Sequence, residues 1–168
     1  MRYRLDIVAP SVAEAVQHAG GWIFDRVMAG WDVNVLLAEP GDTRPLSILG
    51  AQTVDFESVL AAGDDQPHPQ ALAVAADLVD TDARVREGVL RALDYGMTEV
   101  ALWGEARPVE LDRNVDSVEH RLSSAARVFK AQALAAAAIS DIAVAPTETF
   151  RSGAMSCPPI GADLIPAS

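Results

Sequence analysis

The chain has 168 residues, of which 50% are hydrophobic, so it is long and apolar enough to bury the core of one globular domain. It carries 13 Lys and Arg residues against 24 Asp and Glu residues, which gives a formal net charge of −11. An acidic surface repels phosphate backbones and anionic lipids, and the composition therefore argues against nucleic-acid and membrane partners.

The cysteine content and the apolar runs predict where the protein works. Cys157 is the only cysteine, so no internal disulfide can form, as expected in a reducing compartment. The first ten residues lack the long apolar run of a signal peptide. No apolar run of about 18 residues follows, as a membrane-spanning helix would need. We therefore expect a soluble protein in the cytoplasm.

The N-terminal part of the chain predicts a strand followed by a capped helix. Residues 4–10 have the composition of a short β-strand that ends at a proline. Ser11 can then cap a helix while Glu14 reaches back from its first turn. Apolar residues recur at steps of three and four from there on, which predicts a helix over residues 11–29.

Two adjacent glycines, Gly20 and Gly21, fall in the middle of this predicted helix. Each glycine in a helix interior costs about 1 kcal/mol relative to alanine, so a local interaction has to offset the loss. Their position far from both helix ends disfavours a phosphate-binding loop. We expect close packing, in which a neighbouring backbone or a tryptophan ring approaches the glycines, and a mild bend of the helix is the alternative.

The next part of the chain predicts short elements separated by turns. β-Branched and leucine residues predict a strand over residues 31–39, and a second, shorter apolar run over residues 45–51 is compatible with another strand. Residues 53–62 have the pattern of a short helix. Residues 63–70 are rich in glycine, proline and polar side chains, which is typical of a loop.

The region that follows repeats the order strand, helix, strand. The alanine content of residues 71–79 favours a helix, but their near-continuous apolarity and the flanking turns favour a buried strand, which we predict. Residues 82–96 predict an amphipathic helix, and residues 98–104 predict another strand. After a connecting loop at residues 105–114, we expect a long helix over residues 117–139.

Alternating strands and helices predict a mainly parallel sheet of about four to five strands with helices on both faces. The expected fold class is α/β, a three-layer sandwich of the Rossmann-like or flavodoxin-like type. We expect a single domain over residues 1–140. The tail over residues 141–168 contains scattered proline, glycine and serine residues and is either extended along the body or flexible.

In such folds ligands bind at the carboxyl ends of the strands, where two candidate residues stand. Ser11 lies at a helix N-terminus, whose amides can hold an anion, but it equally fits a pure capping role, and Glu14 would repel phosphate. Glu39 ends the second predicted strand, where dinucleotide-binding domains hold the ribose hydroxyls. Because the glycine-rich fingerprint of those domains is missing, a solvated acidic side chain is the competing interpretation.

Three aspartates, Asp77, Asp80 and Asp82, surround the end of the strand predicted over residues 71–79. Carboxylate oxygens are the ligands that Mg²⁺ prefers, so Asp80 and Asp82 are candidate ligand-binding residues. The alternative is that Thr81 or an aspartate caps the following helix, since acidic side chains complement a helix N-terminus.

The helix predicted over residues 117–139 collects basic residues in an otherwise acidic chain. It carries Arg121, Arg127 and Lys130, with His120 near the same side. Such a stripe can bind a phosphate, an acidic partner or the protein's own acidic surface. A solvated helix face is the alternative.

Several kinds of active site leave no trace in the sequence. No P-loop, H-E-x-x-H or G-x-S-x-G motif is present, and His18, His68 and His120 are not spaced as metal ligands. A Ser-His-Asp arrangement stays open, because its members meet only in space. The sequence therefore leaves the cofactor unknown and indicates no metal site built on histidines.

Three longer runs carry a resemblance: "AGGWIFDRVMAGWDVNVLL", "RPLSILGA" and "EVALWGE". With these runs the chain resembles a group of alanine-rich actinobacterial proteins to which no function is assigned, over most of residues 4–139. The resemblance implies no catalytic or binding residue.

These observations favour a cytoplasmic, non-catalytic protein that binds a small ligand or a protein partner. The first alternative is an enzyme acting with Mg²⁺ on a nucleotide or phosphorylated metabolite, in which Ser11 amides hold the anion and Asp80 or Asp82 the metal. The second alternative is a structural protein that forms a homodimer through aromatic side chains. The residues proposed for that surface are Trp22, Trp31 and Trp103.

Overall fold

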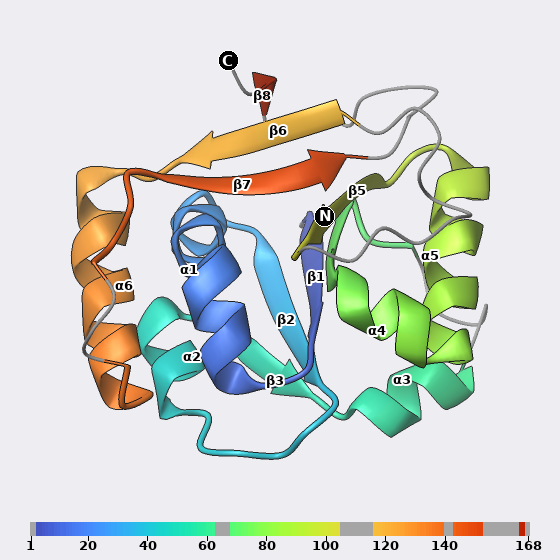
Figure 1. Cartoon of the computed structure of the whole chain (residues 1–168), viewed down its shortest axis with the longest axis horizontal. Helices are drawn as coiled ribbons and strands as arrows, with labels where there is room; N and C mark the ends of the chain where they lie inside the picture. The colour runs from blue at the N-terminus through green and yellow to red at the C-terminus, as the bar shows by residue number, and fades with distance from the viewer. Residues whose placement is uncertain (1–2, 63–67, 105–115, 140–142, 153–164, 167–168) are drawn as a thin grey trace.

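Strands and helices alternate along the chain and assemble into one sheet between two layers of helices (Figure 1). The computed structural model describes residues 3–62, 68–104, 116–139, 143–152 and 165–166. Its strands are β1 (Arg4–Ala9), β2 (Asp32–Leu37), β3 (Gln52–Val54), β4 (Ala71–Ala75), β5 (Glu99–Trp103), β6 (Asp116–Arg121), β7 (Thr147–Ser152) and β8 (Ile165–Pro166). Its helices are α1 (Val12–Met28), α2 (Arg44–Leu49), α3 (Phe56–Ala62), α4 (Ala76–Thr81), α5 (Ala83–Tyr95) and α6 (Ser124–Ala136).

The order of strands in the sheet is β3-β2-β1-β4-β5-β7-β6-β8. Strands β1 to β5 run parallel, whereas β7 is antiparallel to both β5 and β6, and β8 is antiparallel to β6. The first five strands have the Rossmann-like order, whose topological switch point falls between β1 and β4. The predicted α/β class is confirmed, but antiparallel strands extend the described sheet to eight strands.

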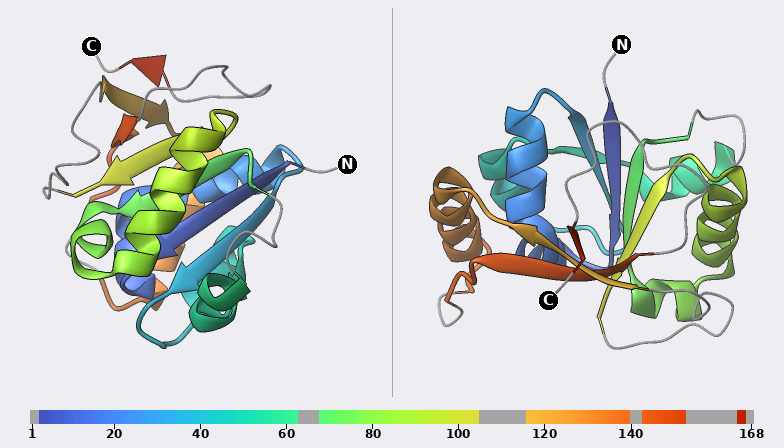
Figure 2. Two further views of the ribbon diagram at one scale, coloured as in Figure 1. Left: turned by 90° about the vertical axis from the view of Figure 1, so that its right-hand side faces the viewer. Right: turned by 90° about the horizontal axis from the view of Figure 1, so that it is seen from above.

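Helices α1, α2 and α6 cover one face of the sheet, and α3, α4 and α5 cover the other (Figures 1 and 2). Successive residues of a strand point to opposite faces, so β1 contributes to both layers. Leu5 and Ile7 are fully buried, while Arg4 and Asp6 line a cavity on the α3–α5 face. Within the described residues, no helix combines the length and the apolar character needed to cross a membrane.

Gly20 and Gly21 lie where α1 packs against α6 and β7. A Cβ atom on Gly21 would come closer than 3.0 Å to the Leu122 side chain, and one on Gly20 would lie 3.3 Å from Cγ of Lys130. The amides of Gly21 and of the next residue both donate hydrogen bonds of 2.7 Å to the Glu148 carboxylate. Close packing at the glycines is therefore confirmed, but side chains approach them rather than a backbone or a tryptophan ring.

The strand considered for residues 45–51 does not form, because α2 occupies most of that range and β3 follows it. Pro45 stands in the first turn of α2, and Gly50 ends the helix with a left-handed φ of 87°. Proline at the start and glycine just past the end are helix signals. The apolar run between them resembles a strand only when those two residues are disregarded.

The helix predicted over residues 117–139 is wrong in its first part, which forms β6, and correct in the part that forms α6. Val118, His120 and Leu122 are buried in alternation, as side chains of a strand are. Val118 and Leu122 are also four residues apart, so they fit a helical period equally well. The strand predicted over residues 71–79 is likewise shorter than expected, since α4 begins directly after β4.

Part of the predicted tail belongs to the sheet. Residues 147–152 form β7, which lies between β5 and β6. Phe150 of β7 is 1% exposed, and its ring centroid lies 5.2 Å from that of Trp22 in α1. Residues 147–152 of the predicted tail are therefore extended along the body. The domain boundary predicted at residue 140 would divide β7 from the strands β5 and β6 that it pairs with. The loop predicted over residues 105–114 lies outside the described residues.

Candidate functional site

The carboxyl ends of β1 and β5 bring together Ser11, Glu14 and Trp103, which we call the edge site. Ser11 is the N-cap of α1, and its Oγ accepts a hydrogen bond of 3.3 Å from the Glu14 amide. The predicted capping role of Ser11 is therefore confirmed. The Glu14 side chain contacts β5, where its Oε1 accepts a hydrogen bond of 3.2 Å from the Trp103 indole Nε1. A carboxylate is thus held beside the topological switch point, where ligands bind in this class of fold.

His18 lies one helical turn beyond Glu14 and stacks on the same tryptophan. Its ring centroid is 6.0 Å from that of Trp103, with the planes at 12°. Burial lowers the pKa of His18 more than the neighbouring Glu14 carboxylate raises it. The imidazole is therefore neutral at neutral pH. The uncharged imidazole of His18 packs against the Trp103 ring next to the edge site.

Ser11 also borders a cavity of about 290 Å³ at the carboxyl ends of β1 and β2. The other walls include Glu39 and Asp42 from the loop after β2 and residues 136–138 at the end of α6. The structure thus brings Ser11 and Glu39 to one cavity, as their places at strand ends suggested. Asp42 is paired with Arg44 at 2.6 Å, while the Glu39 carboxylate and the carbonyl end of α6 face the N-terminus of α1 across the cavity, so negative and positive partial charges both line it.

The side chains of Asp80 and Asp82 do not form a common metal-binding site. Asp82 is the N-cap of α5, where its side chain accepts a hydrogen bond of 2.9 Å from the Arg84 amide. Asp80 is exposed on α4. Within the part of the chain that the structure describes, no three His, Cys, Asp or Glu side chains are grouped so that they could hold a metal ion. The capping alternative accounts for Asp82.

The predicted cationic stripe does not form, because its members lie on two elements. His120 and Arg121 belong to β6, and Arg127 is exposed on α6. Lys130 is 4% exposed, and its Nζ lies 2.7 Å from Oε2 of Glu148. His120 is buried as well, with its Nε2 2.8 Å from the Asp25 carboxylate. The sequence shows that Lys130 and His120 are ionisable, but it does not show that both side chains are buried.

The buried pair of Lys130 and Glu148 is a feature that sequence reasoning missed. Burial raises the pKa of Glu148, although Lys130 and the amides of Gly21 and Trp22 act in the opposite direction. The amides that Glu148 accepts hydrogen bonds from lie more than a hundred residues away in α1, so no local pattern indicates this contact. Glu14 and Trp103 are a second missed pair, because Glu14 fits a capping box and Trp103 a buried strand.

The tryptophans proposed for a dimer surface are all buried within the chain. Trp22 is fully buried, Trp31 is 7% exposed and Trp103 is 2% exposed. The Arg26 guanidinium also covers the Trp31 ring at 4.0 Å from its centroid. The homodimer surface predicted from these three residues is therefore wrong, since none of them is presented to a partner.

No family model matches the sequence, and no curated protein matches it. Solved structures do share its fold. The chain is similar to a deacetylase in complex with teicoplanin, from the biosynthesis pathway of teicoplanin, with a TM-score of 0.64 and 12% identity over 98% of this chain and 99% of that one. The zinc-inhibited form of the teicoplanin deacetylase Orf2 matches with a TM-score of 0.60 and 12% identity, over 89% of this chain and 97% of that one. The A40926 pseudoaglycone deacetylase Dbv21 matches with a TM-score of 0.56 and 14% identity, over 94% and 100% of the two chains.

The comparison corrects the functions inferred from the sequence. The prediction of a non-catalytic binding protein is contradicted, because the solved structures that share the fold over nearly the whole chain are deacetylases. One of those structures is inhibited by zinc. The described residues of this chain do not fit a zinc ion, since the edge site offers a single carboxylate, from Glu14, beside a hydroxyl and an indole.

Proposed function

We propose that the protein is a hydrolase that removes an acyl group, such as acetyl, from an amine, and that the edge site is its reaction centre. The observation that carries this proposal is the position of Glu14. Its carboxylate is held by the Trp103 indole at the carboxyl edge of the sheet, next to the N-terminus of α1. The shared fold of the deacetylases supports the class of reaction.

The geometry can perform amide hydrolysis with the chain's own groups. Glu14 takes a proton from a water molecule whose oxygen bonds to the acyl carbon. The carbonyl oxygen then carries negative charge, which the Ser11 hydroxyl and the positive end of the α1 dipole stabilise. Glu14 is neutral at this stage, so it does not repel the oxyanion. The carbon–nitrogen bond breaks as Glu14 returns the proton to the nitrogen, which gives a carboxylic acid and an amine.

The charges around the edge site favour an acylated amine over a phosphorylated substrate. An amide carbonyl is neutral and tolerates Glu14, whereas a phosphate is repelled by it. The product amine becomes a cation, for which the neighbouring cavity with Glu39 offers an electronegative wall. The same acidic lining argues against the nucleotide substrates considered from the sequence.

The proposal is tested by measuring acetate release from N-acetylglucosamine, its glycosides and N-acetylated glycopeptides. We expect the wild-type chain to release acetate and Glu14→Gln to release it at least about a hundredfold more slowly, the usual loss when a general base is removed. Glu87, which is exposed on α5, provides the matched control Glu87→Gln with unchanged activity. Trp103→Phe keeps the ring but removes the indole donor, and we expect an intermediate rate.

Circular dichroism has to show that each variant is folded before its rate is compared. A folded wild-type chain that releases no acetate from any of these substrates overturns the proposed reaction. Equal rates for wild type and Glu14→Gln would show instead that the hydrolysis does not depend on the edge site.

A further inference from the structure

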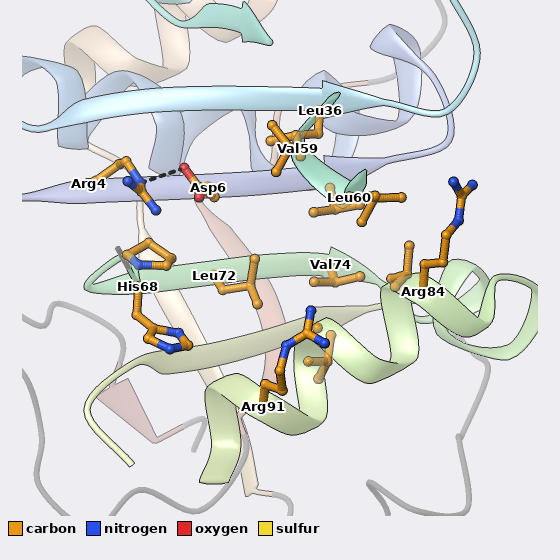
Figure 3. A pocket seen from close by; sticks show the side chains of 15 residues that line it. Arg4, Asp6, Leu36, Val59, Leu60, His68, Leu72, Val74, Arg84 and Arg91 are labelled. Atoms are coloured by element: carbon orange, nitrogen blue, oxygen red, sulfur yellow. Dashed lines mark ion pairs between the residues drawn. The ribbon is translucent and has the colours of Figure 1, made fainter. Parts of the chain in front are cut away.

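A second cavity, of about 130 Å³, lies between α3 and α5, on the face of the sheet that α1 does not cover (Figure 3). Strands β1, β2 and β4 form its floor, and the two helices form its walls. Apolar side chains make up most of the lining, among them Leu36, Val59, Leu60, Leu72, Val74 and Val89. A cavity lined mainly by such groups binds water weakly and favours an apolar occupant.

The arginines around this cavity are engaged by other groups of the protein. Arg4 pairs with Asp6 at 3.2 Å, and Arg84 pairs with Glu57 at 2.6 Å. Arg91 also has an interaction of its own. A ligand that carries a charge would have to compete with these contacts, so the lining favours a neutral molecule over an ion.

Asp6 gives this apolar cavity a polar group. It stands in the middle of β1, between β2 and β4, where the strands of a parallel sheet are usually apolar on both faces. Its side chain is 15% exposed, and burial raises its pKa although Arg4 and Asn34 act in the opposite direction. A carboxylate so far withdrawn from water needs hydrogen-bond donors around it.

The described residues supply this carboxylate with few donors, at long distances. Nε of Arg4 lies 3.2 Å from Oδ1 of Asp6, and Nδ2 of Asn34 lies 3.3 Å from the same atom, whereas charge-assisted hydrogen bonds are usually about 2.7–2.9 Å long. A carboxylate can accept about four hydrogen bonds. Asp6 therefore keeps acceptor capacity, and its side chain borders the cavity (Figure 3). A ligand hydroxyl can use this capacity without bringing a charge to the arginines.

We propose that the cavity between α3 and α5 binds a small neutral molecule in which one hydroxyl group is joined to an apolar body about the size of a benzene ring. The hydroxyl donates a hydrogen bond to Asp6, and the apolar body fills the space between the two helices. The volume fits this size, because an engineered protein cavity of about 150 Å³ binds benzene. This site is separate from the edge site, so its occupation does not depend on the proposed hydrolysis.

The proposal is tested by calorimetric and ligand-observed NMR titration at pH 7 with three probes that share one ring: phenol, benzene and benzoate. We expect phenol to bind, benzene to bind at least about tenfold more weakly, and benzoate not to bind. The first difference arises because a hydrogen bond to a charged acceptor is worth about a tenfold change or more. The second arises because the Asp6 carboxylate repels another carboxylate.

Two pairs of variants assign the binding to this cavity. Asp6→Leu replaces the acceptor by an apolar group of similar size, so phenol should bind about as weakly as benzene does. Asp80→Leu, the same change at an exposed position of α4, should leave both affinities unchanged. Leu72→Trp should fill the cavity and abolish the binding of both probes, whereas Leu72→Met conserves the volume and should retain it.

Circular dichroism has to show that each variant is folded before its affinities are compared. If Leu72→Trp does not fold, Asp6→Leu decides, since a central parallel strand accepts leucine. The proposal is overturned if the folded wild-type chain does not bind phenol, or if benzene or benzoate binds as tightly as phenol. It is also overturned if folded Asp6→Leu keeps the preference for phenol, or if folded Leu72→Trp binds phenol like the wild type.

Discussion

At the scale of residues, Gly21 explains why a helix of this protein carries two glycines. Its missing side chain leaves room for Leu122, and its amide donates to Glu148. The sequence predicts that something packs there, because two glycines inside a helix would otherwise be a loss of stability. It does not predict which groups approach, since both come from segments more than a hundred residues further along the chain.

We expect Gly21→Ala to lower the free energy of unfolding by about 1–3 kcal/mol, the usual cost of overpacking. The energetic cost of the clash with Leu122 should exceed the gain of about 1 kcal/mol that alanine brings through its higher helix propensity. Gly88→Ala is the matched control, because a Cβ atom there would meet only Nη2 of Arg91, at an ordinary contact distance of 3.9 Å, which leaves only that gain. Urea denaturation of the two variants measures both effects. A Gly21→Ala chain as stable as Gly88→Ala would mean that Leu122 moves aside freely.

At the scale of elements, a buried ion pair joins α6 to β7, and its carboxylate also binds α1. Lys130 of α6 forms an ion pair with Glu148 of β7, and the Glu148 carboxylate also accepts hydrogen bonds from two backbone amides of α1. Sequence reasoning placed Lys130 on a cationic stripe that binds an anion, an acidic partner or the protein's own acidic surface, with a solvated helix face as the alternative. It did not indicate that Lys130 is buried, because lysine is rarely buried unless it is paired. Only the pairing of β7 between β5 and β6, which is nonlocal, brings its counter-charge into reach.

Breaking this pair from one side should destabilise the protein strongly. We expect Lys130→Met to lower the free energy of unfolding by about 3 kcal/mol or more, because it leaves the Glu148 carboxylate buried without its cation. The double variant Lys130→Met with Glu148→Gln should lose less than the sum of the two single changes. A double-mutant cycle by chemical denaturation measures this coupling. Additive losses would show that the two side chains do not act as a pair.

At the scale of the whole molecule, four of the five parallel strands could be predicted, whereas β3 and the antiparallel strands could not. Strands β1, β2, β4 and β5 stand out as short apolar runs between turns, and they alternate with helices that have clear ends. Strands β6 and β7 are rich in polar residues and pair across the chain, so their pattern is weak. The edge site follows the same division, since Ser11 and Glu14 are visible as a capping box, whereas the contact with Trp103 requires the fold.

Because β7 lies inside the sheet, we can predict which truncated chain still folds. A chain that ends at residue 140 retains the whole domain expected from the sequence, but it lacks the strand between β5 and β6. It also leaves Lys130 without Glu148 and exposes the surface of Trp22 that Phe150 covers. We expect this chain to show no cooperative thermal transition by circular dichroism, while a chain that ends at residue 152 melts cooperatively. A cooperative transition of the shorter chain would mean that the parallel strands and their helices fold without the C-terminal strands.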